Sequence, residues 1–215
     1  MTARVVADDA AGRAEAADVL RAGGVVATPT DTVYGIAVAL STPGGIERLF
    51  AIKRRPVDKG IMLLLDDAAQ ADRAGAMTPA ARALGAAAWP GGLTIIVPQR
   101  PDVAWPPALT GGTPTIGLRV PAHDAPRALA AAVGPLPTTS ANVSGQPEAR
   151  DALELLDRLG DDVDLILDGG PASGGPASTV VDCTGALPVV LRHGAVELAE
   201  VVAILDRAGV AHGLG

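Results

Sequence analysis

The sequence contains little cysteine and few aromatic residues. Cys183 is the single cysteine among 215 residues, so no disulfide can form within the chain. It lies in the largely apolar run 179–183, which favours a small buried side chain over a catalytic thiol. The aromatic residues are two Trp, one Tyr and one Phe. This is too few for the base-stacking platforms of proteins that bind single-stranded nucleic acid.

Positive charge is also scarce, because 17 Lys and Arg residues face 24 Asp and Glu residues and leave a net charge of −7. Broad attraction to a nucleic-acid backbone requires a large basic surface, so this balance counts against stable nucleic-acid binding. The three histidines lie at 123, 193 and 212, without the spacing of a metal site. We expect no permanent metal.

Long apolar runs are missing as well. No run approaches the roughly 18 to 20 residues that a membrane span requires. Asp8 and Asp9 stand where a signal peptide would be apolar. These features predict a soluble, cytoplasmic protein that does not associate with a membrane.

What is present is a globular composition, with 48% hydrophobic and 19% charged residues. The length allows one sizeable core and is short for two ordinary domains. Apolar periodicity and capping residues predict helices over 8–22, 41–54, 78–89, 124–134, 150–160 and 195–208. Strands are expected over 25–28, 60–65, 93–97, 115–120, 136–139, 163–167, 178–183 and 189–191. Their alternation indicates an α/β protein with one central sheet, parallel or mixed.

Two further segments bear on these elements. Within the helix expected over 150–160, Leu153, Leu156 and Leu159 recur at helical spacing and predict one apolar stripe. The segment 168–177 is rich in Gly, Pro and Ser and is expected to be a loop. Its paired glycines lack the spacing of a phosphate-binding P-loop or a Rossmann motif.

Three polar segments stand out against this background. Residues 29–35, PTDTVYG, follow an apolar run, as a site loop at the end of a strand would. Residues 53–59, KRRPVDK, gather cations in an acidic protein, and 139–145, TSANVSG, place hydroxyl and amide groups beside a glycine. Taken singly, each could be a solvated helix end or an ordinary turn. Together they predict a cleft for phosphates and a small polar substrate.

The same segments resemble the signature of the YrdC-like threonylcarbamoyl-AMP synthases, in its short, single-domain bacterial branch. The other matching motifs follow in the family's order, and the resemblance runs from about residue 12 to about residue 205. They are WPGGLT at 89–94, GLRVPAH at 117–123, STVVD at 178–182 and LRHG at 191–194. The resemblance implies a twisted, mixed sheet flanked by helices with a concave cationic cleft. It also implies one domain over 1–208 with a short tail over 209–215.

The implied activity is that of an ATP-dependent nucleotidyltransferase. L-Threonine, bicarbonate or CO2, and ATP would give threonylcarbamoyl-AMP and pyrophosphate, with Mg2+ arriving on ATP and no organic cofactor. The product would pass to a separate transferase for the threonylcarbamoyladenosine modification of tRNA. Two alternatives remain open: a relative that uses carbamoyl phosphate, and a non-catalytic RNA-binding protein.

The resemblance also assigns roles residue by residue. Lys53 and Arg55 would be catalytic. The implied ATP contacts are Arg55, Lys59, Thr115, Asn142, Arg150 and Arg192. The implied threonine contacts are Thr32, Arg119, Ser140 and Ser178.

Arg54 and His123, by contrast, are expected to be solvated or structural. The chain departs from some relatives at Leu64, where they carry His, and at 148–150, where Glu-Ala-Arg replaces Ser-Pro-Thr. The first departure removes one threonine contact, and the second suggests that Arg150 replaces a hydroxyl contact to phosphate.

Overall fold

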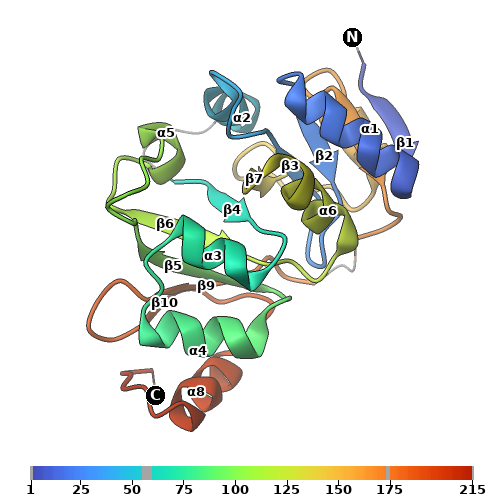
Figure 1. The fold of residues 1–215 in the computed structure, drawn as a ribbon. Coiled ribbons are helices and arrows are strands. Elements are labelled where there is room, and N and C mark those ends of the chain that lie inside the picture. Colours follow the sequence, from blue (N-terminus) through green and yellow to red (C-terminus); the bar gives the residue numbers. More distant parts are fainter. Residues whose placement is uncertain (1, 55–59, 173–174, 215) are drawn as a thin grey trace.

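The computed structural model of the protein describes residues 2–54, 60–172 and 175–214. Ten strands of this described part form one sheet in the order β1-β8-β2-β3-β7-β4-β6-β5-β9-β10 (Figure 1). The strands are β1 Arg4–Ala7, β2 Val26–Thr28, β3 Gly35–Ala37, β4 Met62–Leu64, β5 Leu93–Pro98, β6 Thr115–Arg119, β7 Leu136–Ser140, β8 Leu165–Asp168, β9 Thr179–Asp182 and β10 Val189–Arg192.

The sheet is mixed. β8 pairs in parallel with both β1 and β2, as β6 does with β4 and β9 with β5. The other neighbours pair antiparallel. The expected α/β class is therefore confirmed. Of the two arrangements that the sequence left open, the sheet is mixed and not parallel.

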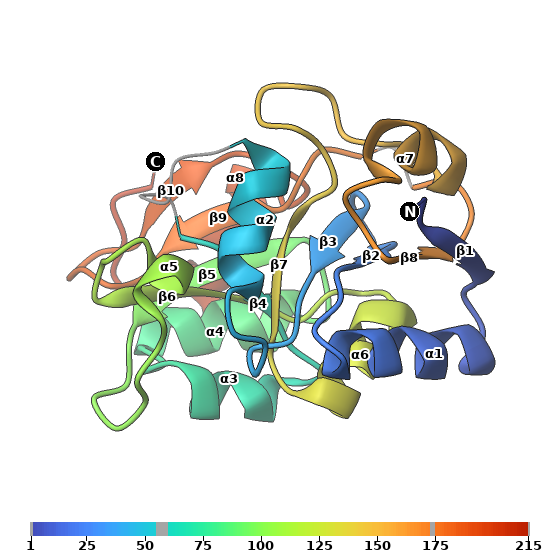
Figure 2. The same cartoon turned by 90° about the horizontal axis from the view of Figure 1, so that it is seen from above.

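Helices cover both faces of the sheet. They are α1 Ala10–Arg21, α2 Gly45–Lys53, α3 Ala68–Ala74, α4 Pro79–Ala88, α5 Pro107–Thr110, α6 Asp124–Val133, α7 Ala152–Leu159 and α8 Leu198–Arg207. Figure 2 shows α1, α6, α3 and α4 along one side, with α2 and α7 on the other. α8 packs on α4 rather than on the sheet. None of the described helices is both long and apolar enough to span a bilayer.

The core lies on both faces of the sheet because successive strand residues point to opposite sides. In β8, Leu165 and Leu167 belong to the cluster under α1 and α6, whereas Ile166 belongs to the larger cluster on the other face. In β4, Leu63 and Leu64 divide in the same way. Central strands buried on both faces read as continuous apolar runs, which is why the sequence revealed them.

Helix starts with a side-chain cap were predicted well. Asp9 accepts a hydrogen bond from the Gly12 amide at 2.8 Å, and Thr78 caps α4 just before its first-turn proline. The start of α2 was predicted wrongly at 41–43. Gly44 is the N-cap, with φ of 72°, and glycine adopts this left-handed conformation without steric cost.

Four short elements were not predicted from the sequence: β1, β3, α3 and α5. β3 has three residues and α5 four, too few for a periodic pattern. The predicted leucine stripe of α7 was confirmed at Leu159, which is buried, and wrong at Leu153, which is 74% exposed while Leu155 is buried in its place.

Candidate active site

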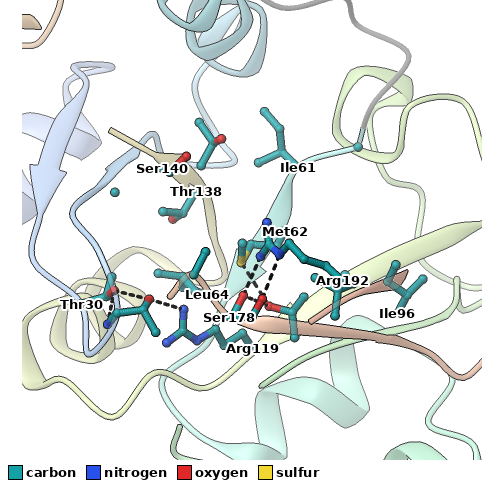
Figure 3. Close-up of a pocket in the computed structure, with 18 of the residues that line it drawn as sticks. Thr30, Ile61, Met62, Leu64, Ile96, Arg119, Thr138, Ser140, Ser178 and Arg192 are labelled. Carbon is teal, nitrogen blue, oxygen red and sulfur yellow. Dashed lines mark hydrogen bonds between the residues drawn. The ribbon is translucent and has the colours of Figure 1, made fainter. Parts of the chain in front are cut away.

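A cavity of about 330 Å³ opens on the central strands of the sheet. Strands β3 to β7, β9 and β10 contribute to its wall, together with the turn before β3 (Figure 3). Of the residues assigned from the sequence, those that line it are Thr32, Thr115, Arg119, Ser140, Ser178 and Arg192. Segments from 32 to 192 along the chain thus converge on one pocket. Thr115 and Arg119 both reach it because they lie four residues apart on β6 and share a face.

Arg119 is buried in the pocket wall, and its side chain is only 4% exposed. Its Nε donates to the Gly91 carbonyl at 2.9 Å, and one Nη donates to Thr32 Oγ1 at 3.0 Å. The other Nη pairs with Asp31 Oδ1 at 2.7 Å. Burial lowers the pKa of Arg119, while the Asp31 carboxylate acts in the opposite direction.

The Thr32 hydroxyl has a defined hydrogen-bond polarity. Thr30 Oγ1 must donate its proton to the Val33 carbonyl, 2.6 Å away, because a carbonyl only accepts. Thr32 Oγ1, 3.1 Å from Thr30 Oγ1, is therefore the donor in that pair. It also accepts from Arg119, so its remaining capacity is a lone pair, which suits an O–H or N–H of a substrate.

Ser178 is almost fully buried at 1% exposure. The Arg192 guanidinium donates to its carbonyl at 2.9 Å and to its Oγ at 3.0 Å. Thr94 Oγ1 lies 2.8 Å from Ser178 Oγ, and either hydroxyl can be the donor. When Thr94 donates, the proton of Ser178 is available to a ligand, so Ser178 can donate where Thr32 can only accept.

Lys53 lies at the end of α2 and is buried at 4% exposure. Its ammonium donates to the Ser140 carbonyl at 2.9 Å, to Ser140 Oγ at 3.0 Å and to Asn142 Oδ1. Ser140 Oγ donates in turn to Asn142 Oδ1 at 2.7 Å. The buried cation Lys53 therefore connects the end of α2 to Ser140 and Asn142 of the segment 139–145. Asn142 does not itself line the cavity, but it accepts a hydrogen bond from the lining residue Ser140.

Arg150 is another assigned residue that does not line the cavity. The Arg150 side chain is 85% exposed and pairs with Glu154 at 3.2 Å. Arg55 and Lys59 lie outside the described residues, so their placement and the cationic character of the cleft remain predictions. Among the described lining residues, the charged side chains are Arg119, Arg192 and Glu148.

Sequence reasoning gave no role to three side chains of this site: Asp31, Thr94 and Glu148. Asp31 and Thr94 occur in the quoted motifs, but their partners lie far along the chain and no local pattern indicates them. Two other expectations agree with the structure. His123 Nδ1 caps α6 by accepting from the Ala125 amide at 3.2 Å. Cys183 is buried, and burial raises the pKa of its thiol to about 12.

Metal-ligating side chains do not gather in groups of three or more within the described segments. Tyr34, fully buried, connects the first motif to the loop after β8. Its hydroxyl donates to the Gly170 carbonyl at 2.7 Å and accepts from the Gly169 amide at 3.2 Å. Burial raises the pKa of Tyr34 to about 12, so this phenol is neutral and serves as an anchor.

The fold and the pocket define an α/β protein with a small-molecule site on a mixed sheet, rich in hydroxyl groups and arginine. The family model Sua5/YciO/YrdC, described as "Telomere recombination", matches residues 18–194. The chain belongs to this family.

Named relatives agree with this membership. The chain is 36% identical over 203 residues to threonylcarbamoyl-AMP synthase of Bacillus subtilis, covering 94% of this chain and 58% of the relative. It is 37% identical over 182 residues to threonylcarbamoyl-AMP synthase of Pseudomonas putida, covering 84% of this chain and 96% of that protein.

The structure of Pyrococcus abyssi Sua5 complexed with L-threonine superposes with a TM-score of 0.87 at 30% identity. The match covers 98% of this chain and 61% of that one. The chain thus spans about three fifths of the length of the Bacillus and Pyrococcus proteins, and nearly the whole of the Pseudomonas protein.

Proposed function

We propose that the protein is a threonylcarbamoyl-AMP synthase that makes threonylcarbamoyl-AMP and pyrophosphate from L-threonine, bicarbonate or CO2, and ATP. The observation that carries the proposal is the convergence of Thr32, Arg119, Ser140 and Ser178 on one cavity of a chain with this family membership. The named relatives favour this activity over a carbamoyl-phosphate-dependent enzyme and over an RNA-binding protein. The product would be handed to a separate transferase that modifies tRNA.

The chemistry requires positioning more than a dedicated nucleophile. The ammonium of threonine first loses a proton to solvent. The resulting amine nitrogen forms a bond to the carbon of CO2 and loses a second proton, which gives a carbamate. A carbamate oxygen then attacks the α-phosphorus of ATP, and the bond from that phosphorus to the bridging oxygen breaks and releases pyrophosphate. Holding both substrates in line can account for roughly 7 to 11 kcal/mol of barrier lowering. Mg2+ would enter with ATP as part of the substrate.

Positively charged side chains beside the phosphates would stabilise the negative charge of the transition state. Arg192 lines the pocket and makes no ion pair within the described residues, so its guanidinium suits an incoming phosphate. Burial lowers the pKa of Arg192, and Glu148 counteracts this. Gly60 lines the pocket directly after the run 53–59. This placement supports ATP contacts by Arg55 and Lys59.

Pyrophosphate release should depend on both small substrates. We expect full turnover with ATP, L-threonine and bicarbonate, and only background release when threonine is omitted or when bicarbonate is omitted from CO2-depleted buffer. A coupled pyrophosphate assay measures this. Equal release without threonine would contradict the proposed function, and release supported by carbamoyl phosphate alone would favour the other enzyme.

Arg55→Ala should lower kcat/KM by about 10- to 150-fold, because it deletes a charge-assisted hydrogen bond to phosphate worth roughly 1.5 to 3 kcal/mol. Steady-state kinetics with ATP varied would show the loss, with Tm unchanged. The matched control is Arg54→Ala, one residue away on an exposed side chain, which should cost little activity. Equal losses in the two variants would refute the role given to Arg55.

A further inference from the structure

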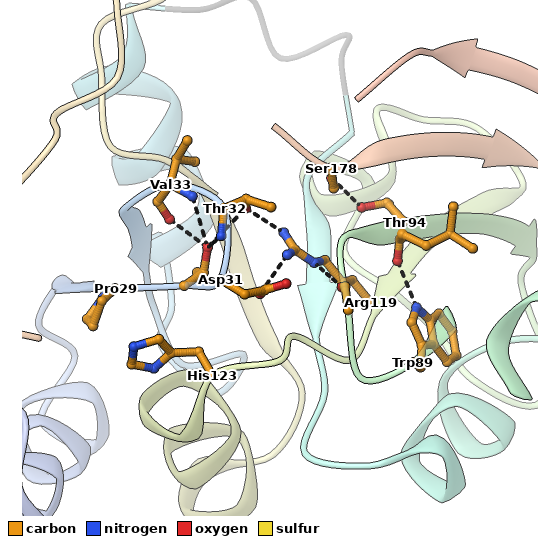
Figure 4. Close-up of polar contacts among 12 residues, drawn as sticks. Pro29, Asp31, Thr32, Val33, Trp89, Thr94, Arg119, His123 and Ser178 are labelled. Carbon is orange, nitrogen blue, oxygen red and sulfur yellow. Dashed lines mark hydrogen bonds and ion pairs between the residues drawn. The ribbon is translucent and has the colours of Figure 1, made fainter. Parts of the chain in front are cut away.

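The two arginines of the pocket are held in different ways. Arg119 forms a direct ion pair with Asp31 at 2.7 Å, and both side chains are largely buried, at 4% and 17% exposure. Arg192 donates to the carbonyl and the hydroxyl of Ser178, both neutral, and no carboxylate lies within ion-pair distance of it in the described part of the chain. Figure 4 shows Asp31 reaching Arg119 from the turn before β3, apart from Ser178.

We propose that Asp31 determines the charge specificity of the Arg119 end of the pocket, making it select a zwitterion over an anion of the same shape. This inference rests on the proposed function, which places an amino acid at this end. Asp31 does not itself line the cavity and acts through Arg119, so it is a positioning and specificity-determining residue.

The argument begins with the net charge of the pair. A buried guanidinium without a partner would attract any anion strongly, because opposite charges interact more strongly at low dielectric. The phosphates of ATP would then compete for the place of the amino acid. The Asp31 carboxylate cancels this charge at close range while leaving the guanidinium its hydrogen-bond geometry.

The donor count shows what remains for a ligand. A guanidinium has five N–H groups, and Arg119 uses three of them on Gly91, Thr32 and Asp31. Two are left for a carboxylate. A zwitterion brings its own compensating ammonium, so the neutral pair can bind it without excess charge. A pure anion brings no ammonium and would meet the Asp31 carboxylate beside the guanidinium that binds it.

Arg192 completes the contrast. Without a directly bonded carboxylate, it keeps its positive charge toward the cavity and suits a phosphate group. The pocket is thereby divided into a neutralised end at Arg119 and a cationic end at Arg192. Asp31 prevents the polyanionic substrate from occupying the wrong end, which is selectivity by an unfavourable field as well as by contacts.

Isothermal titration calorimetry with two ligands of one shape tests this. The probes are L-threonine and the 2,3-dihydroxybutanoate of matching configuration, in which a hydroxyl replaces the α-ammonium. Wild type should prefer threonine by at least about tenfold, the scale of a charge-assisted interaction. Asp31→Asn should reduce this ratio to near unity, and inorganic phosphate should then displace threonine. Asp31→Glu, which retains the charge, should keep most of the preference.

Asp8→Asn is the matched control, because Asp8 is a buried acid paired with Arg13 at 2.6 Å and does not line the cavity. It should leave the ratio unchanged. If Asp31→Asn lowered the affinity for both ligands equally, or left the ratio of the two affinities unchanged, the role of Asp31 would be overturned. If Asp31→Asn does not fold, phosphate displacing threonine from wild type overturns it equally. Failure of wild type to bind threonine would instead count against the proposed function.

Discussion

Replacement of Lys53 by methionine is expected to lower kcat/KM by at least about 100-fold, because two or more hydrogen bonds to a charged group, each worth roughly 1.5 to 3 kcal/mol, are lost together. Methionine is close to lysine in shape but has no N–H donors. The change leaves three acceptors on Ser140 and Asn142 without the ammonium that now satisfies them. Steady-state kinetics with each substrate varied in turn measures the loss.

The pattern of KM values distinguishes two roles for Lys53. If the ammonium holds the loop after β7 in place, the KM for threonine and the KM for ATP should both rise, because Ser140 and Asn142 are assigned to different substrates. If Lys53 contacted only phosphate, the KM for threonine would stay at its wild-type value. A fall in Tm should accompany the change, since a buried polar network loses its central donor.

Arg54→Gly is the control for Lys53→Met. Arg54 adopts φ of 48°, the left-handed conformation that glycine adopts without strain, and its side chain is exposed. We expect unchanged activity and equal or slightly higher stability. Near-wild-type activity in Lys53→Met would show that the network is dispensable and would remove Lys53 from the catalytic set.

The sequence predicted the pocket better than it predicted the connections behind it. The motifs near Thr32, Arg119, Ser140 and Ser178 could be found because polar residues at the ends of apolar strands are a local signal. The partner of each was not predictable. Asp31 and Arg119 are 88 positions apart, and Lys53 and Asn142 are 89 apart. Such pairs depend on the strand order, which local patterns do not specify.

The same limit applies to the fold. Helices with side-chain caps, such as α1 and α4, and central strands such as β5 were predicted because their signals lie within one turn or one apolar run. β1 was missed because it is a short edge strand, largely exposed, whose partners in β8 lie 161 positions further along the chain. Leu153 was misplaced because α7 buries Ala152, Leu155 and Leu159, and an i, i+3, i+6 pattern drifts around the helix.

The role that the sequence implies for Arg150 differs from the contacts that its side chain makes in the structure. The family resemblance implies an ATP contact for Arg150, whereas its exposed side chain pairs with Glu154 in the first turn of α7. Glu148, two residues earlier, is the member of this segment that lines the pocket. The departure of residues 148–150 from the family pattern therefore introduces a carboxylate at the pocket, next to the cationic end formed by Arg192.

Valine should be discriminated against far more strongly than serine as a replacement for threonine. Loss of the methyl group, as in serine, costs about 1 to 3 kcal/mol in an apolar pocket, or roughly 10- to 200-fold in kcat/KM. Loss of the hydroxyl, as in valine, leaves polar groups of the site unpaired and should cost about 10⁴-fold.

The polarity of the site supports this order. Thr32 Oγ1 has only a lone pair left, and Ser140 Oγ likewise donates to Asn142 and accepts from Lys53. Each can therefore accept one donor from the substrate. The single O–H of threonine or serine can satisfy one of them, and the methyl of valine can satisfy neither. Threonine amide should also be a poor substrate, because it offers Arg119 no negative charge. Competition kinetics with serine, valine and threonine amide measures the three ratios. Use of valine as readily as threonine would mean that these hydroxyls do not contact the side chain of the substrate.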